Sequence, residues 1–212
     1  MKMTQYDTYL PIGENCAPAY YLKKYGLRTE AYPLDWMGFD AHTFIHLFQT
    51  GFSDFFSSIA EEKSIKTNTC RSIRDTTNNI LSIHDFPKDR EIPEMLNEFH
   101  STMRRRYLRL HERLMNARSL LMLGYRQDTA EQVINTLLEF SAIYPHLSSH
   151  LINVCDTPEM ASSELRQKRY DLNDRLTVTC CYFNNSYDTD HQKKFGLWGN
   201  EVLWHRVLTD DR

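Results

Sequence analysis

Short apolar runs recur along the chain, and each ends in polar or turn-forming residues. Runs rich in aliphatic, β-branched and aromatic residues are typical of β-strands. Two of them, SLLMLGY and LTVTCCYF, are largely apolar, which is typical of parallel strands buried on both faces of a sheet. The pattern predicts strands at 7–12, 80–85, 119–125, 150–156 and 176–183.

Helical patterns fill the segments between these strands. The first predicted helix begins near Asn15, a suitable N-cap, and ends at Gly26, a suitable stop. A long helix is predicted at 93–117, where apolar residues recur at steps of three and four. The sequence TAEQ at 129–132 has the pattern of a capping box and begins a third helix, and a fourth is expected after Pro158.

Strands that alternate with helices predict an α/β fold, in which helices cover a parallel sheet. We expect a single domain over 1–212, with three layers and a mostly parallel five-stranded sheet in the order 2-1-3-4-5. The segment 32–77 does not fit the alternation, because it is rich in aromatic residues and too long for a simple connection. We expect it to be a helical insertion packed over the sheet edge or the site.

The composition restricts the classes of function. Hydrophobic residues make up 41% of the 212 residues and charged residues 25%, with a formal net charge of −3, so neither nucleic-acid binding nor disorder is indicated. There is no apolar run of signal-peptide length at the N-terminus and none of the roughly 20 residues that span a bilayer, so we expect a cytoplasmic protein without a membrane partner. The five cysteines have no CxxC spacing, which argues against a disulfide framework and a cysteine-rich zinc site.

Cys16 lies in the sequence GENC, between the first predicted strand and the first predicted helix. Ligands of parallel sheets bind beyond the carboxyl ends of the strands, so this loop is a candidate site. The N–H groups and positive dipole at a helix start would lower the pKa of a thiol there. We expect Cys16 to be a nucleophile, with Asn15 and nearby backbone N–H groups stabilising an oxyanion and Gly13 allowing the tight turn before it.

A thiol nucleophile needs a base, and usually a group that orients the base. The second predicted strand, NNILSIHDF, ends near His84, and in the expected order it is the neighbour of the first strand. His84 would then rise from the same sheet edge as Cys16, one strand spacing away. For the orienting acid our first choice is Asp35, because an acid between Leu34 and Trp36 needs a buried partner.

Three alternatives remain open for the base and its orienting acid. Asp85 and Asp75 are nearer to His84 in the sequence than Asp35 is. Asp188 and His191 form a rival pair in the sequence DTDH, with the spacing that serine esterases with a similar sheet use late in the chain.

Four motifs together resemble those of a known family. They are PIGENCAPAYYLKKYGLRTEAYPLDWM, NILSIHDF, RRYLRL and LWGNEVLWHRVL, in this order. The resemblance, over about residues 7–208, is to the bacterial family of putative papain-like cysteine peptidases. It implies a cysteine nucleophile at Cys16, a histidine at His84 and an acid at Asp35. That family is in turn similar to a capsule-biosynthesis group that handles acyl-coenzyme A, which keeps acyl transfer as an alternative.

We therefore expect a cysteine hydrolase that acts on a peptide or other small acyl substrate through Cys16, His84 and Asp35. The second hypothesis is a thiol acyltransferase with a coenzyme A thioester as donor; no other cofactor is expected. The third is a non-catalytic module that binds an anion through Arg126, which follows the third predicted strand. Arg126 and Trp36 are the expected substrate contacts.

Two further patterns in the sequence have simpler explanations than a binding site. The histidine pairs 42/46 and 146/150 are spaced for metal binding but lack an HExxH arrangement, so we expect no metal. Arg105, Arg109 and Arg113 lie on one helix face, where a solvated surface is the simpler interpretation and an anion site the alternative.

Overall fold

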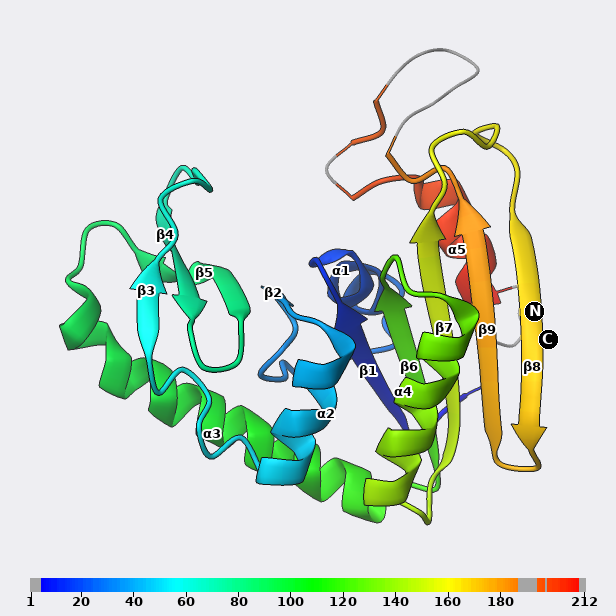
Figure 1. Cartoon of the computed structure of the whole chain (residues 1–212), viewed down its shortest axis with the longest axis horizontal. Helices are drawn as coiled ribbons and strands as arrows, with labels where there is room; N and C mark the ends of the chain where they lie inside the picture. Colours follow the sequence, from blue (N-terminus) through cyan, green and yellow to red (C-terminus); the bar gives the residue numbers. More distant parts are fainter. Residues whose placement is uncertain (1–4, 187–193, 197, 210–212) are drawn as a thin grey trace.

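The computed structural model describes residues 5–186, 194–196 and 198–209, and within them the main sheet has five strands (Figure 1). Four strands pair in parallel, and the fifth closes the far edge in antiparallel orientation. In spatial order they are β1 (Thr8–Gly13), β6 (Ser119–Tyr125), β7 (Ser148–Asp156), β9 (Leu176–Phe183) and β8 (Arg166–Asn173). The prediction of an α/β fold with a mostly parallel five-stranded sheet is confirmed.

Helices cover both faces of the main sheet, and its central strands feed two apolar layers. In β6, Leu120 and Met122 belong to one buried cluster and Leu121 and Leu123 to the other. This follows from the strand geometry, in which successive side chains point to opposite faces. The first cluster includes residues of α2 (Ala41–Thr50), α3 (Ile92–Asn116) and α4 (Ala130–Ile143), and the second includes residues of α1 (Ala17–Lys24) and α5 (Glu201–Thr209).

A second, antiparallel sheet lies on the β1 side of the main sheet (Figure 1). In spatial order its strands are β2 (Met37–Gly38), β5 (Ile80–Pro87), β4 (Cys70–Asp75) and β3 (Ile59–Glu61). The turn between β4 and β5 is held by the Asp75 carboxylate, which accepts the backbone N–H of Thr77 at 3.0 Å. Asn79 completes the turn with a φ of 54°, a conformation that asparagine tolerates.

The predicted strand order 2-1-3-4-5 is wrong in its first member. The segment 80–85 belongs to β5, which pairs with β2 and β4 and not with β1. The run TTNN before it forms a tight hairpin turn, and such a turn makes the flanking strands antiparallel neighbours. The remaining predicted strands do lie in the order 1-3-4-5. The segment 32–77, predicted to be helical, contains α2 together with β2, β3 and β4.

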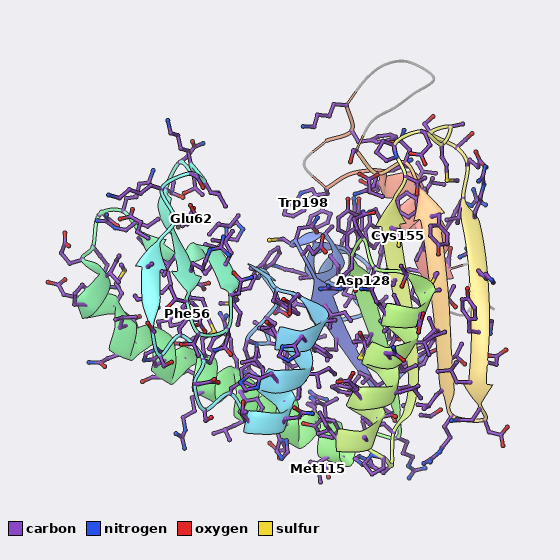
Figure 2. The ribbon with its side chains drawn as sticks, viewed as in Figure 1. Phe56, Glu62, Met115, Asp128, Cys155 and Trp198 are labelled. Carbon is purple, nitrogen blue, oxygen red and sulfur yellow. The ribbon has the colours of Figure 1, made fainter. Side chains whose placement is uncertain are left out.

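The long helix α3 runs along both sheets (Figure 1). Near its start, the ring of Phe99 lies 4.9 Å from that of Phe86 in β5 and 4.9 Å from that of Phe56, which Figure 2 labels beside the second sheet. Near its end, Leu110 and Leu114 are fully buried in the cluster of the main sheet. This helix therefore fixes the position of the second sheet relative to the main sheet.

The prediction of a fourth helix after Pro158 is wrong, because the chain there leads into β8. The strand β8, with the sequence RQKRYDLN, is mostly exposed. It is rich in charged residues and lacks the apolar pattern that predicted the other strands of the main sheet. Charged residues on an edge strand oppose pairing with a second chain. In the described residues, no helix is both long enough and apolar enough to cross a membrane.

Candidate active site

The loop after β1 is held in a tight turn against β6. Gly13 has a φ of 147°, and a Cβ atom there would lie 2.7 Å from the carbonyl oxygen of Tyr125. The next residue, Glu14, donates its backbone N–H to the same oxygen at 3.1 Å. Only glycine allows both the positive φ and this close approach. This is the tight turn that the sequence predicted at Gly13, before the proposed nucleophile.

Cys16 lies at the N-cap of α1, just beyond the carboxyl end of β1. Its carbonyl oxygen accepts the first helical hydrogen bond, from the N–H of Tyr20 at 3.0 Å, and its side chain is partly exposed. Asn15 is one residue before the N-cap, but its Oδ1 still accepts the N–H of Ala17 at 2.9 Å. In the part of the chain that is described, the backbone N–H groups of Asn15 and Cys16 donate to no protein acceptor. Both N–H groups are thus available as donors in the loop that carries the thiol.

The structure brings His84 to Cys16, with 3.6 Å between Nε2 and Sγ. The route differs from the predicted one, because His84 comes from the second sheet and not from a strand next to β1. In the register of β4 and β5, Arg71 pairs with Phe86 and Ile73 with Ser82, so residues 83–85 stand opposite one residue. This bulge interrupts the alternation of β5 and leaves the imidazole exposed toward Cys16. The thiol of Cys70 supports the bulge by donating to the His84 carbonyl at 3.3 Å.

Asp35 is buried away from His84, in an ion pair with Arg28. Its Oδ2 also accepts the backbone N–H of Tyr32 at 2.7 Å. Burial raises the pKa of Asp35 to about 6, although the Arg28 guanidinium opposes this shift. Among the described residues, no hydrogen bond joins Asp35 to His84. The acid did need a buried partner, as the sequence indicated, but that partner is an arginine seven residues earlier.

The alternative acids have different surroundings. Asp75 holds the β4–β5 turn and the backbone N–H of Phe56, so it has a structural role. Asp85 accepts the Ser82 hydroxyl at 2.6 Å and lies close enough to Cys16 to affect its ionisation. The rival pair Asp188 and His191 lies outside the described residues.

The ionisation of Cys16 differs from the sequence prediction. Burial, together with the negative charge of Asp85, raises the pKa of this thiol to about 11. The helix start was expected to lower it, but desolvation of the thiolate outweighs the partial positive charge of the N-terminus. A thiol of this kind is protonated at neutral pH and reacts as a nucleophile only if a base removes its proton. The His84 imidazole is in position to do so.

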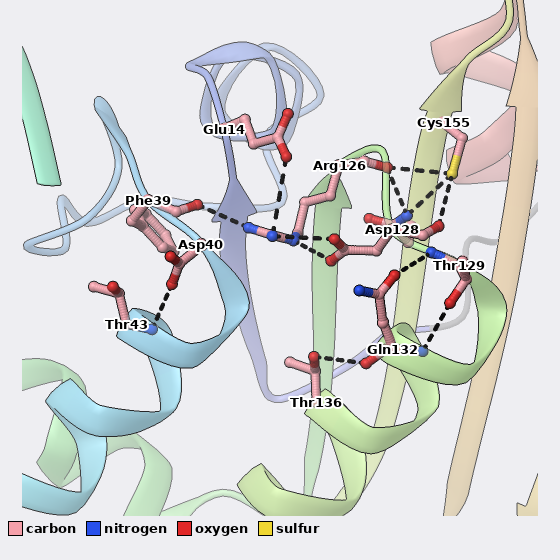
Figure 3. A network of polar contacts seen from close by, with 11 residues as sticks. Glu14, Phe39, Asp40, Thr43, Arg126, Asp128, Thr129, Gln132, Thr136 and Cys155 are labelled. Carbon is pink, nitrogen blue, oxygen red and sulfur yellow. Dashed lines mark hydrogen bonds and ion pairs between the residues drawn. The ribbon is translucent and has the colours of Figure 1, made fainter. Parts of the chain in front are cut away.

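Arg126 is occupied by the protein itself, contrary to its predicted role as a substrate contact (Figure 3). It is buried at the end of β6, donates Nη1–H to the Phe39 carbonyl at 2.7 Å and forms a two-pronged ion pair with Asp128. The carboxylate of Glu14 lies 4.0 Å from its Nη2. These contacts tie the loops after β1, β2 and β6 together. They leave little of the guanidinium for an anion, which weakens the anion-binding hypothesis.

One indole ring contacts the His84 ring, and a second indole ring contacts the first. Trp36, an expected substrate contact, has its ring centroid 6.1 Å from that of His84 in an edge-to-face arrangement. The Trp36 ring also lies 6.3 Å from that of Trp198, at an interplanar angle of 61°. Trp198, labelled in Figure 2, stacks on Tyr20 of α1 at 4.1 Å. Trp198 is partly exposed, whereas Trp204 is fully buried.

The remaining polar patterns have structural partners. On α3, Arg109 donates to the Ala31 carbonyl and Arg113 forms a two-pronged pair with Glu30, so both hold the segment after α1. His46 pairs with Asp54. Within the described ranges, no group of three or more His, Cys, Asp or Glu side chains could hold a metal ion.

Comparisons with known proteins cover the segment that builds this pair. The profile of a family described as putative papain-like cysteine peptidase (DUF1796) matches residues 7–143, which include Cys16 and His84. The chain is also 26% identical over 161 residues to an uncharacterised protein, R408, of Acanthamoeba polyphaga mimivirus, covering 64% of this chain and 72% of that protein. No solved structure matches the chain significantly. Because the relative is viral, a bacterial origin stays a prediction.

Proposed function

Because the chain belongs to the family of putative papain-like cysteine peptidases, we propose that it is a cysteine hydrolase in which Cys16 and His84 form a catalytic dyad. The observation that carries this proposal is the 3.6 Å contact between the Cys16 thiol and His84 Nε2. Two further features support it: the thiol lies at a helix start, and the imidazole is placed by a bulge in an otherwise regular strand. Bulges next to reactive groups often serve to aim a side chain.

The proposed reaction is the cleavage of an amide or a peptide bond. His84 Nε2 accepts the thiol proton while Cys16 Sγ forms a bond to the carbonyl carbon. The tetrahedral oxyanion is stabilised by the backbone N–H groups of Asn15 and Cys16. The C–N bond then breaks, and the proton on His84 goes to the leaving amine. Water, deprotonated by the same imidazole, releases the acid and restores the thiol.

No acid hydrogen-bonds to the His84 ring within the described residues, so a dyad is proposed here in place of the predicted triad with Asp35. The Trp36 ring limits the orientations of the imidazole from one side, and the Cys70 contact fixes the backbone of His84. Asp85 carries the nearest carboxylate for which the structure indicates an effect on the pair. We assign it a charge effect on Cys16 and no part in proton transfer.

The test is chemical labelling followed by peptide mapping. Iodoacetamide at neutral pH should alkylate Cys16 in the native protein faster than Cys70, the other partly exposed thiol among the described residues. The His84→Ala variant should lose this preference, and the His42→Ala variant, which changes an exposed histidine on α2, should keep it. Preferential labelling of Cys70, or no effect of His84→Ala, would remove the dyad.

Acyl transfer would share the first half of this reaction and differ in the acceptor. Incubation with acetyl-coenzyme A and with a peptide ester, followed by mass spectrometry, separates the two donors. An acetyl increment on Cys16 from the thioester alone would favour the transferase hypothesis over the hydrolase.

A further inference from the structure

The two indoles beside the proposed dyad form a corner. Trp36 and Trp198 meet at 61° with their centroids 6.3 Å apart, and both rings are partly exposed. The Tyr20 ring covers one face of Trp198 at an interplanar angle of 4°. The Trp36 ring also contacts the His84 ring in a T-shaped arrangement, so the corner lies next to the proposed base. A substrate group next to the scissile carbonyl would meet this corner.

Two carboxylates lie close in the sequence to the residues of the proposed dyad. Asp85 stands next to His84 in the bulge, and Glu14 precedes Cys16 by two residues. The positive charge nearest to Glu14 is Arg126, which is already matched by the two oxygens of Asp128. Among the described side chains, no hydrogen bond or ion pair joins a lysine or arginine to Cys16 or His84, and no cation–π contact is made with either indole.

A cation already lies over an aromatic ring at the border of this corner. Lys24 Nζ lies 5.6 Å from the centroid of Tyr20, on the ring system that Trp198 extends. Its charge is matched by Glu201 at 2.6 Å. Indole faces attract cations more strongly than phenol faces do, and a nearby carboxylate adds to the attraction.

We propose that the Trp36–Trp198 corner, with Asp85, selects substrates that carry a cationic side chain next to the scissile acyl group. This inference rests on the proposed hydrolase function and adds the class of substrate to it. The ammonium or guanidinium group would lie between the two indole faces while its aliphatic stem covers the Trp36 edge. Polyanionic donors such as coenzyme A thioesters are disfavoured by the same charges.

The first experiment measures selectivity with the full chain. Three fluorogenic amides are compared, with lysine, norleucine or glutamate as the residue whose carbonyl is cleaved. Norleucine keeps the stem of lysine and lacks its charge. We expect kcat/KM for lysine to exceed that for norleucine by about tenfold, which corresponds to ~1.4 kcal/mol, and the glutamate substrate to be the slowest. Equal or faster cleavage of the norleucine amide would overturn the proposal.

Variants assign the selectivity to the corner. Trp36→Leu and Asp85→Asn should each lower the ratio of lysine to norleucine, which corrects for any change in the reactivity of Cys16. The control Asp89→Asn alters an exposed acid four residues further along the chain and should leave the ratio unchanged. A ratio that survives both Trp36→Leu and Asp85→Asn contradicts the role of the corner.

A binding measurement separates this inference from the hydrolase proposal. In Cys16→Ala protein, the fluorescence of Trp36 and Trp198 is titrated with N-acetyl-lysine amide and N-acetyl-norleucine amide; Trp204 is fully buried and serves as a constant background. About tenfold tighter binding of the lysine amide is expected. If this binding is seen but no amide acylates Cys16 in the native protein, the hydrolase proposal fails while the cation site stands. If amides are cleaved without any preference for lysine, only the cation site fails.

Discussion

The alkylation rate of Cys16 should depend on His84, and the size of the effect follows from the pKa of the thiol. The perturbation is His84→Ala, which removes the base 3.6 Å from the thiol. With a thiol pKa of about 11, the thiolate fraction at pH 7 is ~10⁻⁴, against ~3% for an ordinary cysteine of pKa about 8.5, a deficit of ~300-fold. A more basic thiolate is also more nucleophilic, with a Brønsted coefficient of about 0.45, which recovers ~13-fold.

The net expectation for His84→Ala is therefore alkylation of Cys16 about 20-fold slower at pH 7 than that of a cysteine in a free peptide. The assay is the rate of iodoacetamide labelling of Cys16 by mass spectrometry, from pH 6 to 11, in a Cys70→Ser background. In His84→Ala the rate should rise about tenfold per pH unit toward pH 11, because ionisation of the thiol then limits the reaction. With His84 present, the rate at pH 7 should be at least tenfold higher and should level off well below pH 11.

Two results would refute this reasoning. A His84→Ala profile that levels off near pH 8 to 9 would show that the thiol is not desolvated as the structure indicates. Superimposable profiles with and without His84 would show that the imidazole does not take the proton. The His42→Ala variant controls for the loss of any exposed histidine.

The remaining predictions concern the supports of the site. Asp35→Asn should leave Arg28 buried without its counter-charge and lower the free energy of unfolding by about 3 kcal/mol in urea titrations. The labelling rate of Cys16 in the folded protein should stay within twofold of the unsubstituted protein. A large loss of this rate would restore Asp35 as the orienting acid. Gly13→Ala should lower the free energy of unfolding by about 2 kcal/mol in the same titrations and slow the labelling of Cys16, because the added Cβ meets the Tyr125 carbonyl. The control Gly26→Ala adds a Cβ with no other atom within 4 Å, so it should lower the free energy of unfolding by only ~1 kcal/mol and leave the labelling rate unchanged. Arg126→Met should lower the free energy of unfolding by about 3 kcal/mol, because it leaves the Asp128 carboxylate without its counter-charge. It should not weaken the binding of an anionic thioester more than the binding of a neutral ester.

Much of the main sheet could be predicted from the sequence, because its central strands are buried on both faces. The run from Leu120 to Leu123 supplies both apolar layers, which is typical of a strand buried on both faces of a sheet. The exposed strand β8 has no such constraint, and its sequence RQKRYDLN carried no strand signal. The loop position of Cys16 followed from the order of strand, turn and helix, and was predicted on the same grounds.

The partners of Cys16 were harder to predict, because they depend on how distant segments pack. His84 was assigned to the pair through a strand order that is wrong, and it reaches Cys16 through a bulge that no sequence pattern announces. Asp35 was expected to find a buried partner and does, but whether that partner is a histidine or an arginine is settled only in three dimensions. The raised pKa of Cys16 likewise depends on the burial of the thiol and on Asp85, neither of which local sequence specifies.

The helix α3 has a consequence for how the chain can vary in length. Its 25 residues span ~37 Å, and it packs on Phe86 of the sheet that carries the base at one end and on the sheet that carries the nucleophile at the other. The length of this helix therefore sets the distance between Cys16 and His84. Four residues added at its centre would move the second sheet by about 6 Å and rotate it by about 40°, so both sheets could fold while thiol and imidazole no longer meet. Loops tolerate insertions, but the length of this helix is part of the active-site geometry.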